Sequence, residues 1–319
     1  MITETVSVNR IELEVTHAGT GRVVLLLHGF PEHAHSWRHQ VDALADAGYH
    51  AIAPNQRGYG ASTRPEQIAD YSIHHLVGDA VALCDHYGAE APVVVGHDWG
   101  AFVAWHAALM RPDRFAGVVG MSVPYVPRLD KSTLELVDER RNGGFHYIRY
   151  FQEPGVAEAE LDGDVDGFMR AIMWGASGDE TGATPPDPMT QTRMVDPTQV
   201  PDGLPDWLRE EDLAIYVEAF RAAGFTGPLN WYRNFHRNFE LTAAWSGLPI
   251  TIPSLFIGGS ADPVLRGPEP GDPSPMLPVM EHFCTDHRGT VVIDGEGHWI
   301  QQEDPEATNA ALLTFLASL

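Results

Sequence analysis

Apolar and polar positions alternate in blocks along the first 125 residues. Continuous apolar runs such as VVLLL suit strands that are buried on both faces of a sheet. Other segments repeat apolar residues every three or four positions, the spacing of a helix with one buried face. The pattern predicts strands at Ile11–Val15, Val23–Leu27, His50–Ala53, Pro92–Val95 (ending at Gly96) and Val118–Val123, and helices at Ile73–Tyr87 and Ala101–Met110. Strands that alternate with helices predict a mostly parallel sheet with crossover helices.

The pattern changes after about residue 126. Up to about Ser246 the chain has helical stretches, loops rich in Gly, Pro and Asp, and many aromatic residues, but no strand pattern. Beyond it we predict strands at Ser254–Ile257 and Val291–Ile293 and a closing helix at Pro305–Leu316. We therefore expect an α/β core made of residues 1–125 and 247–319, with an inserted helical cap at 126–246. The cap lies at the carboxyl ends of strands, where α/β folds bind ligands.

Composition excludes several classes of protein. The formal charge is −24 with a single lysine, Lys131, so the surface repels phosphates and anionic membranes. We expect neither a nucleic acid nor a membrane as a partner. No apolar stretch reaches the roughly 18 residues of a membrane helix, and no signal peptide pattern is present. Two cysteines, Cys84 and Cys284, match no zinc or disulfide framework and indicate the cytoplasm.

The segment GHDWG, residues 96–100, carries the most informative pattern. It joins a predicted strand to a predicted helix, as the nucleophile elbow G-x-nucleophile-x-G does. The middle residue is Asp98, and a carboxylate is already ionised at neutral pH. It can attack a saturated carbon and form an alkyl ester, so an epoxide or an alkyl halide suits it better than an ester substrate. The alternative is that Asp98 only forms a turn or caps a helix.

A second turn, HGFP at residues 28–31, follows the predicted strand Val23–Leu27. In the elbow fold, one oxyanion donor is the N–H after the nucleophile, here Trp99. The other comes from a loop after an earlier strand, which points to the Phe30 N–H. We take His28 as structural. The alternative for this turn is an ordinary HG-P turn without a catalytic role.

The candidate base lies near the end of the chain. His298 follows the predicted strand Val291–Ile293, and the order nucleophile, acid, histidine is the one this fold uses. Asp262, also just after a strand, is the best acid to orient the imidazole; the alternative for Asp262 is a turn former in an Asp-Pro turn. Asp294 and Glu296 compete for that role but lie very near His298 in sequence. The base would activate a water that attacks the ester.

An epoxide oxygen leaves as an alkoxide and needs a proton or hydrogen bond, which a tyrosine O–H supplies. The inserted segment offers Tyr147 and Tyr150 in FHYIRYFQEPG and Tyr232 in NWYRNF. Spacing alone does not choose among them, and the aromatic residues there also suit plain core packing.

Taken together, these segments resemble the soluble epoxide hydrolases of the α/β-hydrolase fold, in a bacterial form without an extra N-terminal domain. The matching segments are HGFPE, SWRHQ, RGYG, GHDWG, YFQEPGVAEAEL, PLNWYRN and GHW. The resemblance implies that Asp98 is the nucleophile, Asp262 the relay acid and His298 the base. It implies that Tyr147 and Tyr232 polarise the epoxide. GHDWG is also found in haloalkane dehalogenases, whereas YFQEPG and LNWYRN are more specific.

The implied activity is hydrolysis of an epoxide to a vicinal diol through an ester on Asp98, with no metal and no organic cofactor. The rivals are a dehalogenase with the same nucleophile, which Phe30, Trp99 and the two tyrosines disfavour, and a non-catalytic small-molecule receptor. One departure from the family is Asn55, where such chains often carry Asp; this position is not catalytic.

Several features stay open in the sequence. The sequence is compatible with a homodimer. The loops Gly175–Pro205 and Arg266–Pro278 are candidates for shaping substrate access. Aromatic residues that either line an apolar pocket or belong to the core are Trp37, Phe151, Trp174, Phe239 and Trp299.

Overall fold

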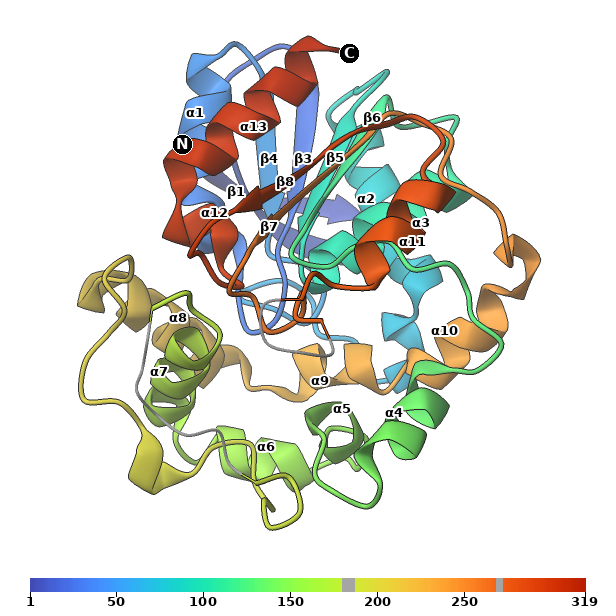
Figure 1. The fold of residues 1–319 in the computed structure, drawn as a ribbon. Helices are drawn as coiled ribbons and strands as arrows, with labels where there is room; N and C mark the ends of the chain where they lie inside the picture. The colour runs from blue at the N-terminus through green and yellow to red at the C-terminus, as the bar shows by residue number, and fades with distance from the viewer. Residues whose placement is uncertain (180–186, 268–271) are drawn as a thin grey trace.

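The chain folds around one eight-stranded sheet with the order β1-β2-β4-β3-β5-β6-β7-β8 (Figure 1). The computed structural model describes residues 1–179, 187–267 and 272–319. Parts of the loops Gly175–Pro205 and Arg266–Pro278 therefore lie outside the described residues. The strands are β1 (Ile2–Val8), β2 (Ile11–Ala18), β3 (Val23–Leu27), β4 (His50–Pro54), β5 (Val93–His97), β6 (Gly117–Met121), β7 (Ser254–Gly259) and β8 (His287–Ile293).

Most of the sheet is parallel, as the sequence predicts. β1 and β2 pair antiparallel, and so do β2 and β4, while the five ladders from β4 to β8 are parallel. The register Leu27↔Gly96 and His97↔Met121 aligns the carboxyl ends of β3, β5 and β6. β7 and β8 end together at Gly259↔Ile293. The loops that follow these strands therefore meet at one edge of the sheet, and they carry the candidate catalytic residues.

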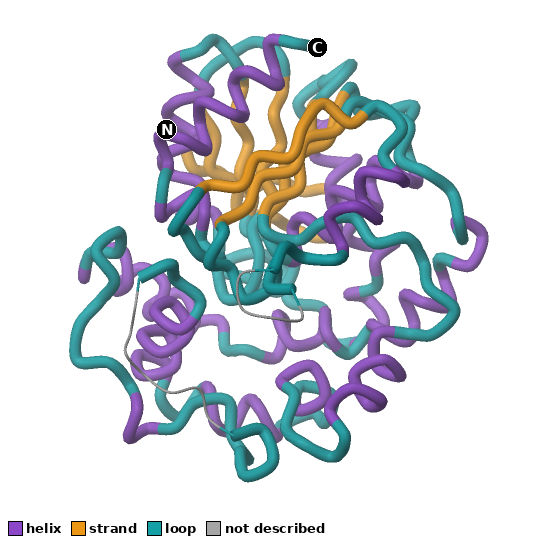
Figure 2. The backbone as a smooth tube through the Cα atoms, in the orientation of Figure 1, coloured by secondary structure: helices purple, strands orange, loops and turns teal. Residues whose placement is uncertain are grey.

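Helices cover both faces of the sheet (Figure 2). Because side chains alternate along a strand, β3 sends Val24 and Leu26 to one buried cluster and Leu25 and Leu27 to the other. The core helices are α1 (Arg38–Asp46), α2 (Ile73–His86), α3 (Trp99–Met110), α11 (Met276–Phe283), α12 (Ile300–Glu303) and α13 (Pro305–Ala317). α1 and α13 pack on the first face, and α2 and α3 on the other (Figure 1).

Between β6 and β7 the chain forms an arc of helices below the carboxyl ends of the strands (Figure 1). These helices are α4 (Thr133–Arg141), α5 (Tyr147–Tyr150), α6 (Val156–Leu161), α7 (Val165–Gly175), α8 (Glu210–Ala223), α9 (Thr226–Tyr232) and α10 (Phe235–Leu241). The insertion also contains the short 3-10 turns η3 (Pro197–Gln199) and η4 (Ala243–Trp245), while the turns η1 (Ala34–Trp37) and η2 (Ile68–Tyr71) belong to the core. No strand occurs in this insertion within its described residues.

The predicted strands and helices of the core are confirmed, with corrections at their ends. β5 does not stop at Gly96 but runs through His97, and β8 begins at His287 rather than Val291. The pattern missed β1, most of whose residues are exposed, because an exposed edge strand lacks buried apolar alternation. It also missed α1, α11 and the one-turn α12. Among the described residues, no helix combines the length and hydropathy needed to span a bilayer.

Candidate active site

Asp98 sits on a tight turn between β5 and α3. Its backbone has φ 52° and ψ −118°, outside the conformations that a non-glycine residue usually adopts. The flanking glycines make this turn possible through close contact: a Cβ on Gly96 would lie 2.0 Å from the Gly100 carbonyl oxygen, and one on Gly100 would lie 1.9 Å from that of Leu27. The G-x-D-x-G pattern is therefore a steric requirement of the turn that presents Asp98.

His298 lies between two carboxylates. Its Nε2 is 3.6 Å from Asp98 Oδ2, and its Nδ1 is 3.0 Å from Asp262 Oδ2. Burial alone would lower the pKa of His298, but Asp262 and Asp98 outweigh it and raise the pKa well above the ordinary value. Of the three acids considered from sequence, Asp262 is therefore the one in contact with His298, whereas Asp294 accepts a hydrogen bond from Ser260.

The predicted oxyanion donors lie beside Asp98. The Phe30 N–H donates to Asp98 Oδ1 at 2.8 Å, and Trp99 begins α3 directly after Asp98. The role of the Trp99 N–H stays a prediction. His28 is buried, accepts a hydrogen bond from the Gln56 N–H, and has its pKa lowered to about 4 by burial. It is therefore neutral and structural, as the sequence suggested.

Tyr147 and Tyr232 face each other from two cap helices. Their ring centroids are 6.0 Å apart, and the Tyr232 ring also lies 5.0 Å from that of Trp99. Tyr232 is buried, whereas Tyr147 is 38% exposed. Burial and the nearby charge of Asp98 raise the pKa of both phenols above the ordinary value. Both hydroxyls therefore keep their protons at neutral pH and are able to donate hydrogen bonds.

The two tyrosine helices are tied to each other. Gln152, just after α5, donates from Nε2 to the carbonyl oxygens of Ile148 (2.7 Å) and Tyr232 (3.1 Å). Arg233, just after α9, donates to the Phe151 carbonyl at 3.0 Å and pairs with Glu158 at 2.8 Å. These contacts link the segments YFQEPGVAEAEL and PLNWYRN, which carry Tyr150 and Tyr232.

A buried network behind Asp98 was not foreseen from the sequence. His97 Nδ1 is 2.7 Å from Glu32 Oε2, and its Nε2 donates to the His298 carbonyl oxygen at 2.7 Å. Ser122 Oγ donates to the same carbonyl, and all three side chains are fully buried. The backbone of the candidate base is thus held from two sides. The only sequence signal was the presence of Glu32 and His97 in the segments HGFPE and GHDWG.

The structure divides the predicted pocket residues. Phe151 contacts both tyrosine rings, and Trp299 lies 4.9 Å from the His298 ring, with its indole N–H donating to the Met173 carbonyl. Trp37 as a pocket residue is wrong, because it packs in the core cluster on the opposite face of the sheet.

The two remaining aromatic side chains lie away from these contacts. Phe239 stacks under the Arg128 guanidinium and lines a separate cavity. Trp174 is half-buried near Gly203, and its place in the pocket stays a prediction.

Asn55, the departure from the family pattern, has a structural role. Its Oδ1 accepts from the Ala34 N–H at 2.8 Å, and its amide donates to Glu14. These contacts hold the loop that follows β4 and leave the candidate site unaffected.

Comparison with known proteins places this geometry in a family. A profile described as "alpha/beta hydrolase fold" matches residues 22–152. Epoxide hydrolase A of Mycobacterium tuberculosis is 48% identical over 98% of this chain and 97% of its own length. Epoxide hydrolase 2 of Siraitia grosvenorii is 39% identical over 98% of this chain and 97% of its own.

Solved structures give the same result. The crystal structure of epoxide hydrolase A from Mycobacterium thermoresistibile superposes with a TM-score of 0.90 at 46% identity, covering 99% of this chain and 98% of that one. An epoxide hydrolase from Vigna radiata gives a TM-score of 0.87 at 38% identity, covering 100% and 98%.

Proposed function

Because this chain belongs to the epoxide hydrolases of the α/β-hydrolase fold, we propose that it adds water to a small-molecule epoxide and releases a vicinal diol. The observation that carries the mechanism is the position of the Asp98 carboxylate. It lies within ion-pair distance of His298, which Asp262 holds from behind, and the Tyr147 and Tyr232 rings gather on the cap side.

In the first step, Asp98 attacks a ring carbon of the epoxide. Its Oδ1 is occupied by the Phe30 N–H, which leaves Oδ2 as the attacking atom. The Oδ2–carbon bond forms while the ring carbon–oxygen bond breaks. The epoxide oxygen, held by the two phenols, takes a proton from one of them. General acid catalysis of this kind contributes about 10² to 10⁴ in rate.

In the second step, His298 removes a proton from water, and the hydroxide attacks the ester carbonyl carbon of Asp98. The negative charge forms on Oδ1, where the Phe30 N–H already lies 2.8 Å away, and where we place the Trp99 N–H as second donor. The bond between the Asp98 carbonyl carbon and Oδ2 then breaks, so Oδ2 leaves with the product, and the released alkoxide takes the proton from His298. The proton left on the Asp98 carboxyl returns to the tyrosine that gave up its proton in the first step, which regenerates the starting state of the site.

Replacement of the base separates the two steps. In His298→Gln, styrene oxide should still alkylate Asp98, but the ester should persist and steady-state turnover should fall by about 10³ or more, since no base activates the water. Intact-protein mass spectrometry should show an addition of one styrene oxide. His282→Gln, an exposed histidine, is the control and should behave like the unmodified protein. Equal loss of alkylation and turnover would contradict the two-step scheme.

Isotope labelling gives an independent test. In a single turnover in ¹⁸O-labelled water, the label should appear in the Asp98 carboxylate and not in the diol, because water attacks the ester carbonyl. Peptide mass spectrometry locates the label. Label in the first diol molecule would show direct attack of water on the epoxide and refute the covalent mechanism.

Three further proposals concern the whole protein. Residues 126–246 form the cap domain, and residues 1–125 with 247–319 form the core. The protein resides in the cytoplasm, in keeping with two buried free thiols, Cys84 and Cys284. A homodimer stays a prediction that light scattering after size-exclusion chromatography tests directly.

A further inference from the structure

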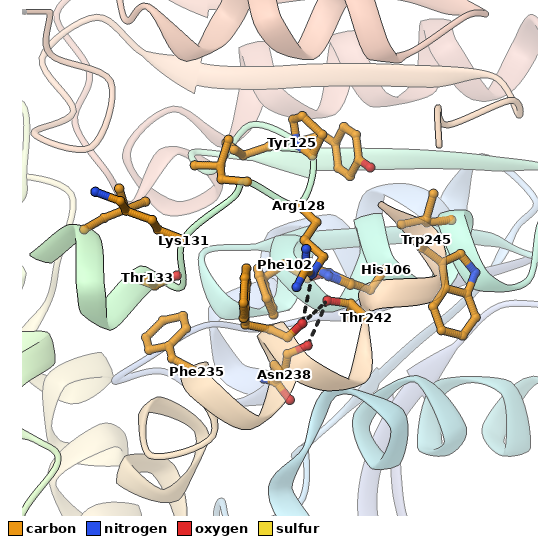
Figure 3. Close-up of a pocket in the computed structure, with 16 residues that line it drawn as sticks. Phe102, His106, Tyr125, Arg128, Lys131, Thr133, Phe235, Asn238, Thr242 and Trp245 are labelled. Atoms are coloured by element: carbon orange, nitrogen blue, oxygen red, sulfur yellow. Dashed lines mark hydrogen bonds between the residues drawn. The ribbon is translucent and has the colours of Figure 1, made fainter. Parts of the chain in front are cut away.

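A cavity separate from the Asp98 turn lies between α3, α10 and the segment that leads from β6 to α4 (Figure 3). Its interior volume is about 130 Å³, close to that of a cavity that accommodates benzene, roughly 150 Å³. Phe102, Leu109, Phe235 and Trp245 supply apolar walls. The exposed Leu129 belongs to the lining, so the cavity reaches the surface. The space therefore suits an apolar body of about the size of a phenyl ring.

Arg128 brings a positive charge into this apolar space. Its guanidinium lies 3.7 Å above the Phe239 ring, and its Nε donates to the Phe239 carbonyl at 2.9 Å. Within the described part of the chain, Arg128 forms no ion pair. None of the 16 lining residues is Asp or Glu, although the chain as a whole carries a charge of −24. Figure 3 shows the guanidinium directed toward Phe102, His106 and Thr242.

The other titratable groups of the lining do not change this balance. Lys131 is paired with Glu139. Burial lowers the pKa of His106 to about 4, and its Nδ1 donates to the Phe102 carbonyl, so it is neutral near pH 7. Arg128 is thus the one unpaired cation of the described lining.

A second polar group of the lining, the Asn238 amide, is turned away from the cavity. Asn238 is buried in the cavity wall, and its Oδ1 accepts from the Ile73 N–H at 2.8 Å. This contact fixes the orientation of the amide, and the Asn238 Nδ2 is buried without a hydrogen-bond partner. An unpartnered buried donor is costly, about 1 to 3 kcal/mol. The amide is turned toward the start of α2, so Arg128 is the residue of the lining that offers free charged donors to the cavity.

We propose that this cavity is a binding site for an organic carboxylate with an apolar body. The carboxylate lies on the guanidinium of Arg128, whose fork of donors matches its two oxygens, and the body fills the space between Phe102, Phe235 and Trp245. A single free cation favours a monoanionic carboxylate over a dianionic phosphate, since a second buried charge would lack a partner.

The cavity is next to the candidate active site. Phe102 and Phe235 lie 5.2 and 4.9 Å from the Trp99 ring, and Phe235 lies 6.0 Å from the ring of Tyr232. Phe102 and Phe235 thus belong both to the cavity lining and to the surroundings of Trp99 and Tyr232. A ligand in the cavity would therefore contact side chains that also pack against the aromatic residues beside Asp98.

Calorimetric titration with 4-phenylbutanoate and its neutral amide tests the proposal. The unmodified protein should bind the acid about tenfold or more tightly than the amide, since a charge-assisted pair is lost in the amide. Arg128→Met should reduce binding of the acid to the level of the amide. Arg237→Met, which removes an exposed arginine of α10, should bind like the unmodified protein. Equal binding of acid and amide to the unmodified protein, or full affinity in a folded Arg128→Met, would overturn the proposal.

A second arm identifies the source of the carboxylate and rests on the proposed function. It compares kcat/KM for 10,11-epoxyundecanoate and its methyl ester, with styrene oxide as the control for turnover. A preference for the acid that disappears in Arg128→Met assigns the carboxylate to the substrate itself. Equal kcat/KM for acid and ester, with 4-phenylbutanoate binding intact, assigns it to a separate compound. Loss of styrene oxide turnover would fault the proposed function without affecting the binding result.

Discussion

At the scale of single residues, the candidate site is an electrostatic balance among three groups. Burial alone would raise the pKa of Asp98, but the hydrogen bond and charge of His298 lower it below the ordinary value, so the Asp98 carboxylate is ionised at neutral pH. The pKa of His298 is raised by Asp262 and by Asp98 itself. In the proposed mechanism, ester formation removes the charge of Asp98. The pKa of His298 therefore falls as the ester forms, which frees the imidazole to accept a proton from water.

This balance also sets a pH window for stability. The raised pKa of His298 stabilises the folded state below its unfolded pKa, about 6.5, and this contribution is lost as pH rises through the folded value. The lowered pKa of Asp98 contributes above about pH 3.9 and is lost as pH falls. The pair therefore contributes fully between about pH 4 and 6.5.

Asp98→Asn tests this coupling directly. The pKa of His298 should fall by about one unit or more, because one of its two carboxylate neighbours loses its charge. The titration of the imidazole Cε1–H signal in NMR spectra measures it. Asp294→Asn, an exposed acid in the preceding turn, should leave the midpoint unchanged. An unchanged midpoint in Asp98→Asn would show that the two residues are not coupled.

At the scale of helices and strands, the elbow and the cap solve different problems. The turn at Asp98 is fixed locally, by glycines that allow close backbone contact. Tyr147 and Tyr232 belong to short helices, α5 and α9, 85 positions apart in sequence by their numbers. Short helices have little stability of their own, so their relative position depends on tertiary contacts. Arg233 supplies several of these, to Phe151 and Glu158.

Arg233→Met should therefore affect both stability and rate. The loss of its cation leaves Glu158 in a buried site without its partner, which should cost about 3 kcal/mol in the free energy of unfolding. The kcat for styrene oxide should fall about tenfold, because the phenols lose their spacing. Denaturant unfolding and steady-state kinetics measure the two effects.

The double variant Arg233→Met/Glu158→Gln separates the two roles. It removes the unpaired charge, so part of the stability should return while kcat stays low. Arg221→Met, an exposed arginine of α8, is the control and should change neither quantity. Recovery of kcat together with stability would indicate that Arg233 acts on folding alone.

At the scale of the whole molecule, the candidate site is built from two parts, with Asp98 and His298 in the core and the two tyrosines in the inserted segment. The indole N–H of Trp231 donates to the Arg57 carbonyl at 3.1 Å near the tyrosines. On the other side, Asp212 of α8 is buried and lies 2.7 Å from His35 Nε2 and 3.5 Å from Arg38 Nε in the core. Both contacts join helices of the inserted segment to the core.

Asp212→Asn should weaken the contact between α8 and the core. Burial alone would raise the pKa of Asp212, but hydrogen bonds from Arg209 and His35 and the charge of Arg38 lower it to about 2. A lowered pKa contributes stability above the unfolded value, about 3.9, and loses it as pH falls toward 2. The variant should lose about 3 kcal/mol at pH 7, and this loss should shrink below pH 4.

Urea unfolding at several pH values checks this. Glu211→Gln, an exposed neighbour on α8, should unfold like the unmodified protein. A loss in Asp212→Asn that does not depend on pH would show that packing, and not the charge, matters at this position.

The sequence by itself determined the features that depend on neighbours in the chain. VVLLL specifies a strand buried on both faces, and G-x-D-x-G specifies a turn that only glycines at residues 96 and 100 permit. Asp98, Asp262 and His298 follow β5, β7 and β8, and their order was readable from the sequence because parallel strands bring their carboxyl ends to one edge. Hydrophobic periodicity and steric limits act over a few residues, so they leave a local record.

Only the tertiary structure decided the features that depend on side chains far apart in sequence. Trp37 and Phe151 are both large aromatic residues within segments that match the family. Trp37 nevertheless packs in the core cluster on the opposite face of the sheet, whereas Phe151 packs against the tyrosines. The Glu32–His97 pair and the Arg128 cavity likewise join distant segments. Whether a side chain is buried or paired with a charge depends on its neighbours in space. When those neighbours are far apart in sequence, the contact between them produces no repeating pattern of residues in the chain. For this reason the chemistry of the turn was predictable, while its supports and the second cavity were not.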